Sequence, residues 1–367
     1  MKFVISREAL LRPLQLVAGV VEKRQTLPVL SNVLLEVRGQ QLSLTGTDLE
    51  VELIGRVTLD EVGVEGEVTV PGKKLMDICR SLPDGAQLEV ALEDQRVNVR
   101  SGRSRFTLST LPATEFPNVD SVGEEKTFAM SQPVLRRAID RTSFAMAQQD
   151  VRYYLNGMLF EVATDGLRTV ATDGHRLATC RVAISGPDEA RQIILPRKGV
   201  LELAKLLTSD SEVSVTLAFS ANHLRAHTEN FSFTSKLVDG KFPDYTRVIP
   251  KNGTNVLIAN RQELRQVFAR TAILSNEKYR GVRLMLNTDL LQVFANNPEQ
   301  EEAEESVGVN YRGASLEMGF NVSYLQDVMS VISTDDVKMT LSDANSSALL
   351  EEPEGGDAVY VVMPMRL

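Results

Sequence analysis

The sequence has no tryptophan, only three histidines and only two cysteines in 367 residues. Cys79 and Cys180 are isolated and lie in apolar surroundings, so we expect two small buried side chains in a reducing cytoplasm rather than a disulfide framework. No apolar run approaches the roughly 20 residues that a membrane-spanning helix needs. The first residues run directly into the first helical pattern and leave no room for a signal peptide. The composition therefore predicts a cytoplasmic globular protein with no membrane segment.

The signatures of catalysis and of metal binding are also missing. The sequence contains no G-x-x-x-x-G-K-[ST] loop, no G-x-G-x-x-G and no G-x-S-x-G elbow. His223 and His227 have the spacing of metal ligands on a helix, but their surroundings predict a β-hairpin, where the two rings are not neighbours. Asp173 and His175 form the most enzyme-like segment, and a hydrolase there is an alternative that lacks a nucleophile. We expect no catalytic residue, no metal and no cofactor.

The most informative feature that is present is one pattern that occurs three times. Each copy has four residues with the spacing 4, 3 and 4, which is one stripe of a helix: Leu10, Leu14, Val17 and Val21, then Leu135, Ile139, Thr142 and Met146, then Leu264, Phe268, Thr271 and Ser275. Ser6, Ser131 and Asn260 precede these stripes, where an N-cap side chain binds the first free amides of a helix. The chain is therefore three copies of one unit, at 1–123, 127–248 and 255–367.

The register continues beyond the helices. Thr172-Asp173 repeats Thr47-Asp48, so we interpret it as a turn at the end of a strand, to which His175 and Arg176 are exposed additions that serve binding. Each unit is expected to contain a strand, a helix, three strands, a second helix and about three closing strands. The fold class is then α+β, with two helices packed on antiparallel sheet in each of three repeated domains.

Charge is distributed unevenly along the chain, whose net charge is −9. Five of the six helical segments carry a net charge of +2, and only 321–332 is negative; the basic segments are 7–24, 71–82, 131–146, 196–207 and 260–274. If the helices of the three units share one side, that side is a basic surface on an acidic body. Such a surface attracts phosphates without reading bases.

Two complementary patches near opposite ends of the chain predict association of two copies head to tail. Arginines follow the second helix of the first unit, an acidic run lies in the third unit, and apolar residues stand beside both. The residues expected at this interface are Lys74, Arg96, Arg103, Arg105, Phe106, Leu108, Ile273, Leu274, Glu299, Glu301, Glu302, Glu304 and Glu305. The alternative is that each apolar residue packs inside its own domain.

Several longer passages resemble one family over the entire chain. They are LSLTGTD (42–48), RSGRSRF (100–106), QDVRYYLNGM (149–158), ATDGHRL (171–177), SKLVDGKFPDY (235–245), ANNPEQEEAEE (295–305) and YVVMPMRL (360–367). With these passages the chain resembles the bacterial DNA polymerase III beta subunits, the replicative sliding clamps. The resemblance implies a homodimeric ring of six similar domains, with helices lining a hole that encircles double-stranded DNA.

The resemblance also implies site residues and partners. It places Arg24, Lys73, Gln149, Tyr153 and Tyr154 at the DNA. It implies a partner-peptide pocket formed by Leu155, Thr172, Gly174, His175, Arg176, Leu177, Pro243, Arg247, Val248, Asn321, Tyr324, Ser347, Val361, Val362, Met363, Pro364, Met365, Arg366 and Leu367. Its partners would be DNA polymerases, the clamp loader, and mismatch-repair and other replication proteins that carry short peptide motifs. The implied function is a nucleoid-associated processivity factor without enzymatic activity. A sequence-specific DNA-binding regulator is the alternative, but the helices offer no cluster of base-reading side chains.

Overall fold

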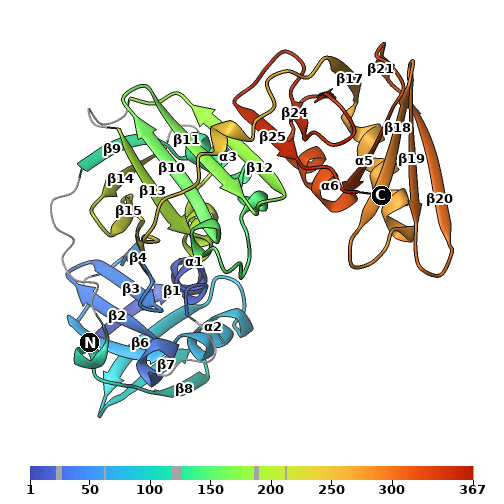
Figure 1. Ribbon diagram of the computed structural model, residues 1–367. Coiled ribbons are helices and arrows are strands. Elements are labelled where there is room, and N and C mark those ends of the chain that lie inside the picture. Colours follow the sequence, from blue (N-terminus) through green and yellow to red (C-terminus); the bar gives the residue numbers. More distant parts are fainter. Residues whose placement is uncertain (22–26, 62, 118–125, 186–189, 211–212, 367) are drawn as a thin grey trace. The chain divides into compact units, whose positions relative to one another are not determined.

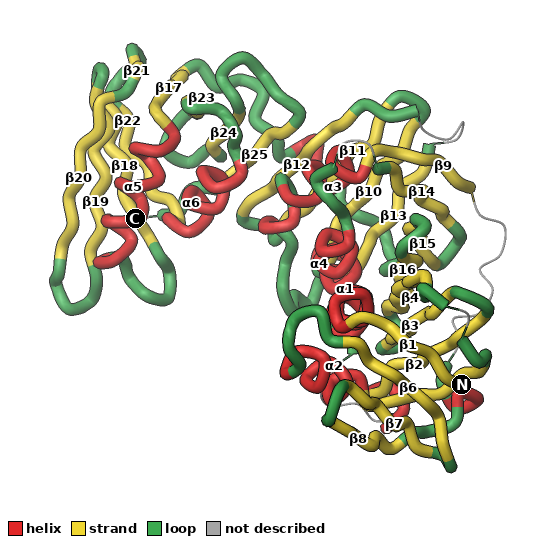
Figure 2. The backbone as a smooth tube through the Cα atoms, turned by 180° about the vertical axis from the view of Figure 1, so that it is seen from behind, coloured by secondary structure: helices red, strands yellow, loops and turns green. Residues whose placement is uncertain are grey.

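The structure, a computed structural model, describes residues 1–21, 27–61, 63–117, 126–185, 190–210 and 213–366 (Figure 1 and Figure 2). Arg24, Leu367 and the expected boundary between the first two repeats lie outside these residues. No helix within the described residues has both the length and the apolar character needed to cross a membrane.

The three repeats are built from the same elements in the same order, except that the third has one additional short strand, β21. The first contains β1 (Lys2–Ser6), α1 (Arg7–Ala18), β2 (Asn32–Arg38), β3 (Gln41–Thr47), β4 (Val51–Thr58), β5 (Gly66–Pro71), α2 (Gly72–Ser81), β6 (Gln87–Glu93), β7 (Arg96–Ser101) and β8 (Ser104–Ser109). The second contains β9 (Lys126–Ser131), α3 (Gln132–Asp140), β10 (Gly157–Ala163), β11 (Gly166–Thr172), β12 (Arg176–Val182), β13 (Arg191–Pro196), α4 (Arg197–Leu206), β14 (Ser214–Phe219), β15 (His223–His227) and β16 (Phe231–Lys236). The third contains β17 (Asn255–Asn260), α5 (Arg261–Thr271), β18 (Gly281–Asn287), β19 (Leu290–Asn296), β20 (Glu302–Gly308), β21 (Asn310–Tyr311), β22 (Leu316–Asn321), α6 (Val322–Val331), β23 (Asp336–Leu341), β24 (Ala348–Glu351) and β25 (Ala358–Val362).

The prediction of three strands between the two helices of a repeat was wrong, because a fourth strand runs directly into each second helix. These strands are β5, β13 and β22, and all three have the same pattern of burial, with three consecutive buried residues at the centre. A strand that is buried on both faces lacks the alternation of polar and apolar residues that identifies a half-buried strand. The sequence pattern therefore did not distinguish this strand from the start of the helix that follows it.

The first helix of each repeat begins where the sequence predicted. Ser6 accepts a hydrogen bond from the amide of Ala9 at 3.3 Å, and Asn260 accepts one from the amide of Glu263 at 3.0 Å. α1 then continues through Pro13 and packs against β3 and β4. Gly55 of β4 permits this close packing, because a Cβ atom there would lie 2.9 Å from Cβ of Pro13.

Each repeat forms two antiparallel sheets of four strands, to one of which β21 adds a fifth strand in the third repeat. This confirms the predicted α+β class. In the first repeat the strand orders are β1-β6-β7-β8 and β5-β2-β3-β4. Strands of neighbouring repeats also pair: β4 pairs with β16, and β12 pairs with β25. An eight-stranded sheet, β5-β2-β3-β4-β16-β15-β14-β9, and a nine-stranded sheet, β13-β10-β11-β12-β25-β24-β23-β17-β21, result.

The continuous sheets explain why the chain divides into two compact units that do not follow the three repeats. One unit comprises residues 1–135 and 198–237 and contains the eight-stranded sheet. The other comprises residues 136–197 and 238–367 and contains the nine-stranded sheet and the sheet β20-β19-β18-β22. The middle repeat thus contributes one of its sheets to each unit.

Candidate functional site

The predicted turn at Thr172-Asp173 is present in the structure. Oδ1 of Asp173 accepts hydrogen bonds from the amides of His175 at 2.9 Å and Arg176 at 3.0 Å. Asp48 makes the equivalent bonds in the first repeat, to the amides two and three residues further on, at 3.0 and 2.7 Å. The interpretation as a structural turn is confirmed, and it occupies the carboxylate that a hydrolase would need.

An apolar floor lies next to this turn, on one face of the nine-stranded sheet. Its members are buried and contact one another: Ala147, Leu155, Leu159, Val170, Leu177, Ile194, Phe242, Tyr245 and Val361. The strand registers explain the floor, because Leu159 is paired with both Ile194 and Val170, and Leu177 is paired with Val361. The structure therefore brings together Leu155, Leu177 and Val361, three of the predicted pocket residues.

The C-terminal tail is fixed beside the floor by two backbone hydrogen bonds. The amide of Met363 donates to the carbonyl of His175 at 2.9 Å, and the amide of Met365 donates to the carbonyl of Gly319 at 2.8 Å. The tail thus lies between the 172–175 turn and β22, whose last residue, Asn321, accepts a hydrogen bond from the amide of Ser323 at 2.9 Å and caps α6. These contacts bring the predicted pocket segments 172–177, 321–324 and 361–366 together.

Exposed residues surround the buried floor. His175 is exposed at the turn, and Met363 and Val248 are 47% and 54% exposed. The other predicted pocket residues are exposed or half-buried: Thr172, Gly174, Pro243, Arg247, Tyr324, Ser347, Pro364, Met365 and Arg366. Of these, Met365 and Arg366 line a separate cavity beside β18 and β22. A buried apolar floor with accessible apolar and polar side chains beside it has the composition of a ligand-binding surface.

Arg176 and Val362 correct the sequence interpretation. They are paired across β12 and β25, on the opposite face of the sheet from Leu177 and Val361, because neighbouring residues of a strand alternate between faces. Val362 is fully buried, and its side chain does not join the floor. Arg176 was expected to be exposed, but only 13% of its side chain is accessible.

The guanidinium group of Arg176 is fully engaged within the protein. It binds Asp173 at 3.0 Å, forms an ion pair with Asp327 of α6, and donates to the carbonyl of Phe144 at 2.8 Å. It also stacks on the ring of Tyr324, 4.5 Å from the ring centre. Arg176 therefore holds the turn against α6, while His175 remains available to a ligand.

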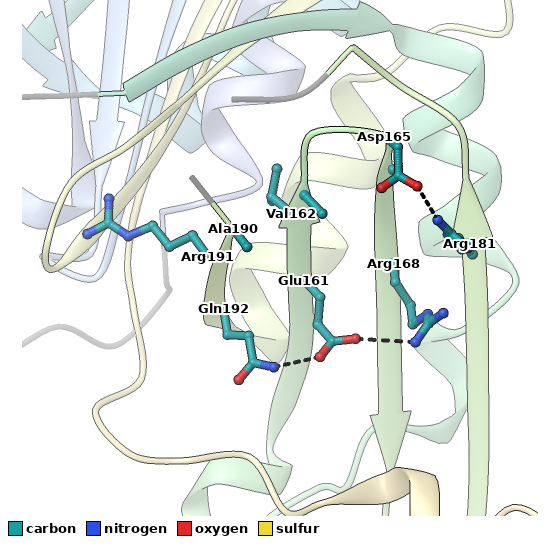
Figure 3. A pocket seen from close by; sticks show the side chains of 10 residues that line it. Glu161, Val162, Asp165, Arg168, Arg181, Ala190, Arg191 and Gln192 are labelled. Atoms are coloured by element: carbon teal, nitrogen blue, oxygen red, sulfur yellow. Dashed lines mark hydrogen bonds and ion pairs between the residues drawn. The ribbon is translucent and has the colours of Figure 1, made fainter. Parts of the chain in front are cut away.

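Val248 belongs to a short segment, the wall, that is anchored by the buried side chain of Tyr245. Sequence reasoning missed Tyr245. Tyr245 begins a short 3₁₀ helix, η5 (Tyr245–Arg247), which Asp244 caps by accepting from the amide of Thr246 at 3.3 Å. The Tyr245 ring belongs to the apolar floor, and its hydroxyl reaches Glu161 and Arg168 on the neighbouring row of the sheet (Figure 3 shows Glu161 and Arg168). Its place at the end of the passage SKLVDGKFPDY, three residues before Val248, was the only available signal.

The predicted DNA-contact residues lie on accessible segments. Gln149, Tyr153 and Tyr154 share one segment of the second unit, where Gln149 is exposed with φ +56° and the two tyrosine rings are 5.8 Å apart, edge to face. Lys73 is exposed at the start of α2 in the first unit. Val151 lies between Gln149 and Tyr153 in the pattern QDVRYY and is 95% exposed. Sequence reasoning missed this residue. Amide, aromatic and cationic groups of this kind suit phosphate and sugar contacts.

The net charge of the helices overstates the cationic surface. Arg7 binds Asp84 at 2.5 Å, Arg137 binds Asp357 at 2.7 Å, and Lys198 binds Asp48 at 2.5 Å. Arg141 binds Glu352 at 3.1 Å, and both side chains are largely buried. The net charge summed over the helical segments cannot reveal such ion pairs. In each pair a basic side chain of a helical segment binds a carboxylate on another element.

Six of the 13 predicted interface residues lie on two edge strands, β8 and β20. β8 is the outer strand of one four-stranded sheet and carries Arg105 and Phe106, whereas β20 is the outer strand of another and carries Glu302 and Glu304. Arg105, Glu302 and Glu304 are exposed, and so are Lys74, Arg96, Arg103, Glu299 and Glu301. Ile273 is 74% exposed and Leu274 half-buried on η6 (Ala272–Leu274).

Two members of the predicted interface make contacts within their own domain: Leu108 is buried there, and Glu305 is paired there. Leu108 is 6% exposed, so the alternative of internal packing holds for this residue. Glu305 is held by Arg270 of α5, with an Nε–Oε1 distance of 2.5 Å. This bond lowers the pKa of the Glu305 carboxyl. Glu305 points toward the helix because it alternates with Glu304 along β20.

Comparison with known proteins assigns the whole chain to one family. The model of the DNA polymerase III beta subunit N-terminal domain matches residues 1–120, that of the central domain 129–244, and that of the C-terminal domain 246–366. The chain is 63% identical to the beta sliding clamp of Pseudomonas aeruginosa and 54% identical to that of Escherichia coli K12, with complete coverage of both chains in each case.

Solved structures agree with these sequence matches. A crystal structure of the DNA polymerase III subunit beta from Pseudomonas aeruginosa has a TM-score of 0.95 at 62% identity, and another from that organism, bound to griselimycin, has a TM-score of 0.97 at 62% identity. The pol III beta of Caulobacter crescentus has a TM-score of 0.92 at 38% identity. All three comparisons cover the complete chains.

Proposed function

The chain belongs to the DNA polymerase III beta subunit family, and from this membership we propose that two copies close head to tail into a ring around DNA. Its function is that of a sliding clamp, a non-catalytic processivity factor of the replicative polymerase. The pocket around Leu155, Leu177 and Val361 is proposed as the site at which replication proteins dock. The two cysteines are free and buried, which supports a location in the reducing cytoplasm.

The observation that carries the ring is the way in which strands join neighbouring repeats. At the first joint β4 of one repeat pairs with β16, the closing strand of the next repeat. At the second joint β12 pairs with the closing strand β25 in the same antiparallel way. The equivalent strands that remain are β20 of the third repeat and β8 of the first, and both are outer strands of their sheets. A second copy whose β8 pairs with β20 would repeat the same joint.

Charge supports this third kind of joint. Glu302 and Glu304 on β20 are exposed, and Arg105 on β8 with Arg103 in the preceding turn is exposed as well. Opposite charges on facing strands contribute roughly 0.2–1 kcal/mol per pair, and like charges oppose pairing. Two copies offer two such joints, and a dimer satisfies both of them when the rotation at the joint closes the ring.

A closed ring holds duplex DNA by topology and needs only weak attraction to the phosphates. The acidic net charge of −9 supports the absence of tight general DNA binding. Lys73, Gln149, Tyr153 and Tyr154 are proposed to touch the DNA backbone, together with Arg24 from outside the described residues. Such contacts carry no sequence information and allow the ring to slide.

The pocket is proposed to take short peptide motifs of DNA polymerases, the clamp loader and mismatch-repair proteins. An apolar side chain that reaches the floor at Leu155 and Leu177 gains roughly 1.5–3 kcal/mol on burial. Three such side chains at the upper end of this range reach the roughly 8 kcal/mol of micromolar binding, an affinity that permits one partner to replace another. We further propose that griselimycin, the ligand in one clamp structure from Pseudomonas aeruginosa, binds this chain at the same pocket.

Retention on DNA of different shape tests the proposed function. The chain, placed by its clamp loader on a nicked circular plasmid, should stay bound during gel filtration in high salt. Cutting the plasmid once should release it, because a ring slides off a free end. Equal retention on circular and cut DNA would contradict a topological link and would favour a protein that reads a DNA site.

A further inference from the structure

A row of polar side chains crosses the nine-stranded sheet directly beside the apolar floor. Gln192, Glu161, Arg168 and Arg181 lie on adjacent strands in direct register, from β13 through β10 and β11 to β12. They line a cavity of about 520 Å³ (Figure 3). Glu161 is two residues from Leu159, a member of the floor, so this polar row and the floor share one face of the sheet.

Tyr245 connects the polar row to the floor. Its ring packs among the floor residues, and only 6% of the residue is exposed. Its hydroxyl donates to Oε2 of Glu161 and accepts from Nη1 of Arg168 at 2.9 Å. Glu161 is held in turn by Gln192, whose Nε2 donates to Oε1 at 2.6 Å. One donated and one accepted bond fix both the depth of the ring and its direction.

The hydroxyl of Tyr245 differs from that of Tyr360, a buried tyrosine on a strand of the nine-stranded sheet. Tyr360 on β25 is 1% exposed, and its hydroxyl has no hydrogen-bond partner within the described part of the chain. Burial of a tyrosine therefore does not by itself require the Glu161–Arg168 pair in this fold. The polar row supplies an anchor that Tyr245 has and Tyr360 lacks.

Tyr245 in turn fixes the wall of the pocket. It is the buried residue of η5, whereas Arg247 and Val248 beyond it are exposed. The amide of Val248 donates to the carbonyl of Tyr245 at 3.1 Å, and Arg247 forms an ion pair with Asp244 at 2.8 Å. The segment is a closed turn, so a displacement of Tyr245 moves Val248 with it.

We infer that Glu161 and Arg168 are positioning residues of the peptide pocket, which act through the hydroxyl of Tyr245 to hold the wall at Val248 over the floor. This inference rests on the proposed peptide-docking function of that site. Neither residue touches the ligand. Their effect is to keep the pocket preorganised, so that binding does not have to order the wall.

Calorimetric titration of griselimycin into the full-length protein tests the inference. Tyr245→Phe and Glu161→Ala should each weaken binding about three- to tenfold, which is the effect of losing one hydrogen bond. Glu161→Gln keeps an oxygen acceptor and should recover most of the affinity. Because both groups act through one bond, Tyr245→Phe combined with Glu161→Ala should bind like Tyr245→Phe alone, within about twofold.

Two matched controls separate positioning from general stability. Tyr360→Phe removes a buried hydroxyl without a partner and should leave the affinity unchanged. Glu36→Ala removes the carboxylate at the corresponding strand position of the first repeat, where Glu36 binds Arg38 at 2.5 Å, and should also bind normally. Dissociation rates and melting temperatures are recorded for every variant. A general loss of stability would lower the melting temperature without producing this pattern of affinities among the variants.

The outcomes distinguish this inference from the function on which it rests. If a chain that lacks residues 363–367 binds griselimycin normally, the proposed pocket is wrong. If that deletion abolishes binding while Tyr245→Phe and Glu161→Ala bind like the unmodified chain, the pocket stands and the positioning role is overturned. Additive losses in the double variant would equally overturn a shared route through Tyr245.

Discussion

The guanidinium group of Arg176 makes its four contacts at the joint between the second and third repeats. The sequence places Arg176 in a family pattern and next to a predicted turn. The burial of its side chain, however, depends on α6, which is about 150 residues away in the chain. Sequence reasoning correctly predicted the turn at Asp173, which local hydrogen bonds define. It could not predict the ion pair with Asp327, because that pair exists only once β12 and β25 have joined.

Replacement of Arg176 by alanine should destabilise the second unit. Asp173 and Asp327 would lose their shared cation in a partly buried setting, and charge-assisted hydrogen bonds of this kind contribute about 2–3 kcal/mol. Urea denaturation followed by fluorescence of the tyrosines measures the loss. Arg247→Ala is the matched control, since the Arg247–Asp244 pair is largely exposed and should contribute less than about 1 kcal/mol. Equal stability of both variants would contradict the role of Arg176.

The two cysteines should be unreactive in the folded protein. Burial raises the pKa of both thiols, Cys79 and Cys180, from 9.0 to about 11. The thiolate is therefore scarce at pH 8, and the thiol reagent DTNB should modify both only after unfolding. The folded state holds these protons up to a higher pH than the unfolded state, so stability should fall as pH rises from 9 to 11. Rapid modification of native protein at pH 8 would show that one thiol is accessible.

At the scale of elements, the sequence predicted the first helices well and the strands less well. The caps at Ser6 and Asn260 are local features, and the structure confirms them. The 4, 3, 4 stripes are confirmed only in part, because α1 and α5 end before the fourth stripe position and α3 ends before the third. The fourth strand of each repeat was missed because it is buried on both faces. The basic character of the helices was counted correctly, but ion pairs such as Arg141–Glu352 show that part of this charge joins repeats.

The C-terminal tail is the element on which partner binding should depend most. Deletion of residues 363–367 removes Met363 from the rim and both backbone bonds to His175 and Gly319. Titration calorimetry with polymerase peptides should then detect no binding. The edge strands β8 and β20 remain, so gel filtration should still give a dimer. Normal peptide affinity of the shortened chain would place the pocket elsewhere.

At the scale of the whole molecule, the triplicated sequence predicted three similar folds but not how they are joined. The sheets continue from β4 into β16 and from β12 into β25, and no property of one strand in isolation indicates its partner in another repeat. Once the two joints are known, the unmatched edges β8 and β20 identify the place of a second copy. Closure of the proposed ring therefore depends on pairing between these two edges.

A charge exchange across the two edges tests this pairing most directly, with native mass spectrometry as the readout. One variant carries Glu302→Lys and Glu304→Lys on β20, and the other carries Arg103→Glu and Arg105→Glu at β8. Each variant alone should give mainly the 40.5 kDa chain, because both of its joints would bring like charges together. An equimolar mixture should give a heterodimer of about twice that mass, since a head-to-tail ring of the two restores opposite charges at both joints. Two variants that dimerise alone, or a mixture that stays monomeric while the unmodified chain dimerises, would contradict a ring closed through β8 and β20.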